Sequence, residues 1–129
     1  MDFALTPEQT QIRETALKQC ADFDETYWLN KDREGTFPHE FYDAMAKAGW
    51  LGIAMPEEFG GSGLGITEAA VLMQAIAESG ACMSGASAIH MNIFGLNPVV
   101  VFGTHEQKSR MLPPLIQGKE KSCFGVTEP

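Results

Sequence analysis

The fold class follows from residues 6–28, TPEQTQIRETALKQCADFDETYW. Thr6 is placed to cap a helix, Pro7 suits the first helical position, and Gln9 completes a capping box by reaching back to the backbone of Thr6. Apolar side chains then recur at helical spacing on one stripe, namely Ile12, Ala16, Cys20, Phe23 and Tyr27. The pattern predicts a long amphipathic helix from this cap to about Trp28.

Start and stop signals divide the rest of the chain into further helices. Polar residues 30–36 indicate a loop, and the glycines and Pro56 between residues 51 and 66 exclude a regular helix there. Helices are expected at 38–48, ended by Gly49; at 67–79, ended by Gly80; at 83–94; at 98–103; and from the capping box at Thr104 to Pro113 and Pro114. The predicted fold is therefore all-α, a bundle of five to six helices.

The last residues of the chain have the composition of a strand. Residues 121–126 suit a pleated, half-buried surface, and the Thr-Glu-Pro at 127–129 looks like the opening of a turn. A lone strand leaves its backbone N–H and C=O groups without partners, so we expect a larger protein that supplies further strands. The expected division is a helical domain at 1–118 and the start of a β-domain at 119–129.

Charge and composition narrow the function. A net charge of −8 without any cluster of Lys and Arg argues against nucleic acid or anionic lipid as partners. Three widely separated cysteines predict neither a disulfide framework nor a zinc site, and a reducing, cytoplasmic location is expected. The histidines lack partners at ligand spacing, so no metal is expected. Polar residues interrupt the apolar stretch 69–102, which predicts two buried helices rather than a membrane span.

Two conspicuous motifs favour structural interpretations. The glycine-rich segment GGSGLG at residues 60–65 lacks the spacing of a dinucleotide-binding loop, a P-loop or a nucleophile elbow, so we interpret it as a turn that allows close packing. Glu57 and Glu58 are adjacent after a proline, which is typical of a solvated turn rather than of a catalytic carboxylate pair.

His90 is the most informative of the histidines. It follows Ala86 and precedes Phe94 by one turn each, on the same face of an otherwise apolar helix. The simpler interpretation is a buried histidine with a hydrogen-bond partner, which we favour. The alternative is that this face, with its small residues, lines a ligand channel.

Several motifs together resemble the N-terminal part of an acyl-CoA dehydrogenase. They are LTPEQ at 5–9, FPHEF at 37–41, AGWLGIAMPEEFGGSGLG at 48–65, GTHEQK at 103–108 with LP at 112–113, and FGVTEP at 124–129. Their order and spacing match that family over essentially the whole chain. The segments PEEFGGSG and TEP are the specific ones, whereas the first helix alone would be a weak match.

The resemblance implies an enzyme that α,β-dehydrogenates acyl-CoA thioesters to 2-enoyl-CoA with FAD as hydride acceptor and an electron-transfer flavoprotein as partner. It implies flavin contacts at Phe124, Val126 and Thr127, and an acyl pocket lined by Ala86, His90 and Phe94. It also implies a homo-oligomer whose catalytic glutamate lies outside these 129 residues, so the fragment alone is expected to be inactive. Two alternatives stay open: a flavin-dependent oxidase or monooxygenase of the same fold, and a non-catalytic helical interaction module.

Overall fold

A computed structural model describes residues 3–125 of the chain, and all of the regular elements in that range are helical. The α-helices, in chain order, are α1 (Pro7–Cys20), α2 (Glu25–Glu34), α3 (His39–Lys47), α4 (Ile66–Ile76), α5 (Cys82–Phe94), α6 (Asn97–Phe102) and α7 (His105–Ile116). Short helical turns, η1 (Trp50–Gly52), η2 (Glu57–Phe59) and η3 (Ala77–Ala81), lie between them. The predicted all-α class is confirmed, with one helix more than expected because the first predicted helix is divided in two.

The division of the first helix corrects the sequence prediction. The capping box is present, with the Gln9 N–H donating to Thr6 Oγ1 at 3.2 Å, but α1 ends at Cys20 and not near Trp28. Asp24 begins a new helix, because its carboxylate accepts the Tyr27 N–H at 2.9 Å and so caps α2.

The polar stretch 30–36, expected to be a loop, is for the most part the second half of α2. The helix ends at Glu34, and Gly35 after it has a φ of 62°, the left-handed conformation that glycine adopts readily at a helix end. The polar composition misled the prediction because α2 buries little more than Trp28 and leaves its other side chains to solvent.

The main core lies where α1, α3, α4 and α5 meet, and its aromatic part joins α2 to α3. The Phe41 ring is fully buried and lies edge-on to Phe23 at 5.3 Å and to Trp28 at 5.0 Å. Aliphatic side chains from α4 and α5, among them Leu72 and Ile89, complete it. Edge-to-face rings add about 0.5–1.5 kcal/mol per pair to ordinary burial, so this cluster fixes the bend between α1 and α2.

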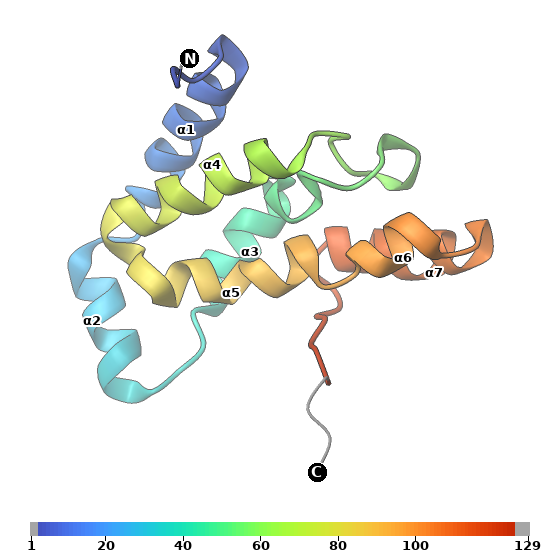
Figure 1. Ribbon diagram of the computed structural model, residues 1–129. Helices are drawn as coiled ribbons and strands as arrows, with labels where there is room; N and C mark the ends of the chain where they lie inside the picture. Colours follow the sequence, from blue (N-terminus) through green and yellow to red (C-terminus); the bar gives the residue numbers. More distant parts are fainter. Residues whose placement is uncertain (1–2, 126–129) are drawn as a thin grey trace.

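The helices α4 and α5 form a bent pair. The run Ile66–Phe102 is long and apolar enough, by length and composition, to cross a membrane. Gly80, with φ of 96°, and Cys82, with φ of 47°, separate α4 from α5, which diverge from a bend (Figure 1), and α6 is a further short helix at the end of the run. The 11 and 13 residues of α4 and α5 each extend only about 16–20 Å, short of the ~30 Å hydrocarbon layer. The two expected helices are formed, but they are only partly buried, since Ile66 of α4 and Met83 of α5 are well exposed.

The glycine-rich segment is a tightly bonded turn. The backbone N–H groups of residues 60–64 all donate to carbonyls of residues 52–57, for example Ser62 to Gly52 at 2.9 Å and Gly63 to Met55 at 2.8 Å. Because these donors are already used, they are not free to bind a phosphate. The structural interpretation of this segment is confirmed.

The two prolines expected to end the last helix lie inside it, which corrects that prediction. Helix α7 continues to Ile116, and the carbonyl of Pro113 still accepts the Gln117 N–H at 3.0 Å. The carbonyls that lose their helical donors belong to Ser109 and Arg110, which are both exposed residues, so the loss falls on the solvent side of the helix. Burial of Leu112, Leu115 and Ile116 against Met55 and Phe59 holds the extra turn in place.

The expected terminal strand is not formed within the described residues. Residues 121–125 have no regular secondary structure there, and the described part of the chain contains no strand with which they could pair. A strand exists only with a partner, so the prediction of a β-domain beginning here depends on further strands. Residue 126, the end of that expected strand, lies outside the described residues.

Candidate functional site

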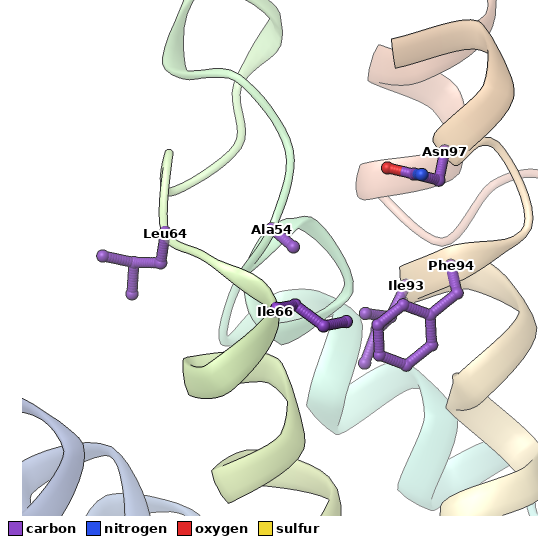
Figure 2. A pocket seen from close by; sticks show the side chains of 6 residues that line it. All are labelled: Ala54, Leu64, Ile66, Ile93, Phe94 and Asn97. Atoms are coloured by element: carbon purple, nitrogen blue, oxygen red, sulfur yellow. The ribbon is translucent and has the colours of Figure 1, made fainter. Parts of the chain in front are cut away.

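Helices α4 and α5 border an open hollow at the open end of their bend. It has a volume of about 350 Å³ and is lined by Ala54, Leu64, Ile66, Ile93, Phe94 and Asn97. Figure 2 shows Ile66, at the start of α4, pointing toward Ile93 and Phe94 of α5. Ile66 is well exposed, so this surface is open to a ligand.

A second hollow lies closer to the bend on the same pair of helices. It has a volume of about 340 Å³ and is lined by Met73, Met83, Ala86, Ser87 and His90. The α5 residues among them recur three or four positions apart and so share one face of the helix. Phe94, in the first hollow, follows His90 by four positions, so the same face of α5 contributes to both hollows. We call this face, with the two hollows, the α4–α5 furrow.

The structure brings the three predicted acyl-pocket residues onto this furrow. Ala86 and His90 line one hollow and Phe94 the other, and the His90 and Phe94 rings lie 5.7 Å apart at the junction. His90 is exposed, so the favoured interpretation of a buried histidine is wrong, whereas its place beside a hollow agrees with the alternative. That these residues contact substrate stays a prediction.

Sequence reasoning missed the part of the furrow that α4 contributes. Ile66 and Met73 are seven residues apart and face α5. Their spacing was visible in the sequence, but a helix with apolar residues on most sides does not reveal which of them faces a hollow.

The segment after α7 carries the predicted flavin contacts. Phe124 is 56% exposed, and a Cβ placed on neighbouring Gly125 would meet nothing within 4 Å. An exposed ring beside open space suits stacking on a flat heteroaromatic group, so the described residues fit a flavin in this respect. Val126 and Thr127 lie outside the described residues, and their roles stay predictions.

The remaining polar candidates are structural. Glu57 and Glu58 are both exposed, and the Glu57 side chain lies against Gly63, as expected for a solvated turn. Within residues 3–125, no group of three or more His, Cys, Asp or Glu side chains is placed to hold a metal ion.

The clearest electrostatic cluster lies away from the furrow, between α2 and α3. The Glu40 carboxylate accepts from the Tyr27 hydroxyl at 2.9 Å and pairs with Lys31 Nζ at 3.0 Å. A hydrogen bond from its own backbone N–H, then those from Lys31 and Tyr27, lower the pKa of Glu40 to about 2. Burial, then the hydrogen bond to Glu40, raise the pKa of Tyr27 to about 12.

This cluster predicts a pH dependence of stability. Because the pKa of Glu40 is about 2 in the fold against 4.5 for a free carboxyl, its stabilising effect is complete above about pH 4.5 and is lost as the pH falls toward 2. Glu40→Gln should therefore lower the melting temperature at pH 7, and this deficit should shrink between pH 4.5 and 2. Thermal melts monitored by circular dichroism, with Glu14→Gln on α1 as the exposed control, measure it. A deficit independent of pH would contradict the assignment.

The comparisons with known proteins agree with this architecture. Residues 6–119 match the family described as acyl-CoA dehydrogenase, N-terminal domain. The chain is 40% identical over its whole length to an acryloyl-CoA reductase (NADH) of Anaerotignum propionicum, of which it covers 32%. It is 36% identical over its whole length to a probable acyl-CoA dehydrogenase of Bacillus subtilis, of which it covers 34%.

Two further relatives are associated with electron-transfer flavoproteins by name. This chain is 36% identical to subunit CarC of the caffeyl-CoA reductase–Etf complex of Acetobacterium woodii, over 76% of this chain and 26% of the relative. The solved structure "Electron transferring flavoprotein of Acidaminococcus fermentans: Towards a mechanism of flavin-based electron bifurcation" contains a chain that matches with a TM-score of 0.83 and 30% identity, over 100% of this chain and 34% of that one.

This chain belongs to the acyl-CoA dehydrogenase family, as its N-terminal helical domain. It spans about a third of the length of the first two relatives named above.

Proposed function

We propose that the chain is the N-terminal part of a flavoprotein that interconverts acyl-CoA thioesters and their 2-enoyl-CoA forms. The observation that carries the proposal is the α4–α5 furrow, an open surface lined largely by apolar residues, on which Ala86, His90 and Phe94 come together. An acyl chain is apolar and narrow, and each buried methylene contributes about 0.8 kcal/mol to binding. The names of the relatives include both dehydrogenases and reductases, which supports the reaction class rather than one direction.

FAD is the proposed cofactor, and when bound it supplies the two-electron exchange with the β-carbon of the acyl group. In this chain Phe124 would pack against its ring system, with Val126 and Thr127 as the further predicted contacts. The furrow residues would bind the acyl chain and keep water from it. The catalytic base is proposed to lie outside these 129 residues, so the chain alone should not turn over substrate.

The proposed redox partner is an electron-transfer flavoprotein. The support is the naming of the Acetobacterium woodii relative and of the Acidaminococcus fermentans structure, to both of which the chain is similar over most or all of its length. A homo-oligomeric, cytoplasmic enzyme is proposed with it.

Reduction of the flavin by acyl-CoA tests the function. The full-length protein should purify yellow, with FAD released on denaturation, and anaerobic addition of an acyl-CoA should bleach its absorbance near 450 nm, or a 2-enoyl-CoA should reoxidise the reduced protein. Rapid oxygen consumption during turnover would favour the oxidase or monooxygenase alternative. A colourless protein that takes up no FAD would favour the interaction module.

Filling the furrow should weaken acyl-CoA binding. Ser87 is exposed and lines the hollow of about 340 Å³, so Ser87→Phe places a ring where the chain would lie without disturbing the core. Loss of two buried methylenes corresponds to about a tenfold increase in KM. Steady-state kinetics with the matched variant Ser109→Phe, exposed on α7, provide the comparison. Equal KM values for the two variants would show that this hollow is not part of the acyl site.

A further inference from the structure

The segment that follows α7 is fastened to the rest of the domain by a buried amide. Asn92 of α5 is 2% exposed, a rare setting for an uncharged polar side chain in an apolar helix. Its Nδ2 donates to Tyr42 Oη at 2.7 Å, to the backbone carbonyl of Glu120 at 3.0 Å and to that of Leu115, in α7, at 3.3 Å. Tyr42 Oη in turn donates to the same Glu120 carbonyl at 3.3 Å. One carbonyl beyond α7 is thus bound by side chains from two helices.

A second attachment lies two residues further along. Ser122 Oγ donates to the Met91 carbonyl of α5 at 2.5 Å. Gly95 makes room for it, because a Cβ there would collide with Ser122 Oγ. Gly95 does not have a positive φ, so its role is to allow this close approach rather than an unusual backbone conformation.

Lys121 lies between these two attachments, and its side chain packs over aromatic rings of the domain. Its Nζ lies 4.2 Å from the centroid of the Tyr42 ring and 5.0 Å from that of Phe37. Such cation–π contacts at partly exposed sites contribute about 0.5–1 kcal/mol. Three consecutive residues, 120–122, are therefore each held, and Phe124 follows only two residues later.

These contacts and the furrow are on different sides of the same helix. His90 and Asn92 are two residues apart, which is about 200° around an α-helix. Helix α5 therefore lines the proposed acyl site with one face and fixes the chain that leads to Phe124 with the other. The two faces of a helix move together, because the backbone hydrogen bonds leave little freedom to shift the residues of one face alone.

We propose that Asn92 and Ser122 are positioning residues that fix residues 119–125 on α5 and, given the proposed function, thereby set the position of Phe124 relative to the flavin. Neither side chain needs to touch a ligand for this role. The amide is suited to it because one NH₂ group can serve both Tyr42 and Glu120, whereas a carboxylate would face the Glu120 carbonyl without a proton to donate.

Three variants of the full-length protein test the role by independent routes. Asn92→Asp keeps the size of the side chain and removes its donors. Ser122→Ala removes one hydrogen bond with little change of volume. Gly95→Ala leaves both donors unaltered but displaces Ser122 and crowds the Met91 carbonyl that accepts from it. Asn30→Asp, exposed on α2, and Ser109→Ala, exposed on α7, make the same chemical changes away from the segment.

The first measurement is hydrogen–deuterium exchange of residues 117–125. The N–H groups of Gly118, Lys119 and Glu120 donate to carbonyls of α7 and so report on whether the segment stays in place. We expect exchange there to rise about tenfold in each of the three variants, while peptides from α1 and α4 stay unchanged. Unchanged exchange at 117–125, or an equal rise throughout the domain, would overturn the positioning role.

The second measurement is the absorbance spectrum of the bound flavin together with its dissociation constant. A displaced Phe124 should shift the flavin band and weaken FAD binding about tenfold in Asn92→Asp, with neither effect in Asn30→Asp. A spectrum and affinity equal to those of the unmodified protein would overturn the link to the flavin. If the unmodified protein binds no flavin, the proposed function itself fails, and the exchange measurement still decides whether α5 fixes the segment.

Discussion

Phe41→Ala is expected to lower the free energy of unfolding by about 3–5 kcal/mol. Phe41 is 0% exposed and its ring contacts Phe23 of the α1–α2 bend and Trp28 of α2. Truncation removes the buried ring and leaves a cavity whose walls come from different helices. Those walls cannot all move inward, because each is fixed by its own backbone hydrogen bonds.

The measurement is urea unfolding followed by far-ultraviolet circular dichroism. Phe3→Ala is the matched control, since Phe3 is 85% exposed and the same truncation there should change the unfolding free energy by less than about 0.5 kcal/mol. If the two variants unfolded at the same urea concentration, Phe41 would not be the centre of the core.

Elements whose signals are local were predictable from the sequence. Both capping boxes formed as expected, the second with the Gln107 N–H on Thr104 Oγ1 at 3.2 Å. In each case donor and acceptor are three residues apart, so no knowledge of the rest of the fold is needed. Gly80 was also recognised as a break, since its φ of 96° interrupts η3 between α4 and α5, although α4 itself ends earlier than expected, at Ile76.

The errors arose where distant contacts outweighed a local rule. The apolar stripe continues past Cys20 to Phe23, but Phe23 packs on Phe41 from a turn rather than from a helix. Pro113 and Pro114 are strong helix breakers, yet burial of the residues around them keeps α7 intact. Such outcomes depend on the energy of packing, which neither spacing nor propensity records.

The candidate site was predictable only on one side. The α5 residues Ala86, His90 and Phe94 share a face by simple helical spacing. Asn92 gave no comparable signal, because its partners Tyr42 and Glu120 are 50 and 28 residues away in the sequence. A lone asparagine in an apolar stretch indicates that a partner exists but not which residue it is.

Gly61→Ala is expected to destabilise the protein by about 3 kcal/mol, through a clash rather than through backbone strain. A Cβ at this position would overlap the Met55 carbonyl oxygen and would lie 2.8 Å from Met55 Cβ. Neither can retreat, because the Met55 carbonyl accepts the Gly63 N–H and its side chain is buried against α7. The φ of Gly61 is not positive, so the left-handed strain that penalises an alanine is absent here.

Two further glycines separate these causes. Gly60→Ala tests strain alone, since Gly60 has a φ of 93° but nothing within 4 Å of an added Cβ, and should cost about 1–2 kcal/mol. Gly125→Ala is the control for both, because an added Cβ there meets nothing within 4 Å and its φ is not positive. It should leave the free energy of unfolding unchanged. Urea unfolding of the three variants should give the order Gly61, Gly60, Gly125. If Gly61→Ala were as stable as Gly125→Ala, the close contact between Gly61 and Met55 would not be required for the packing of this loop on α7.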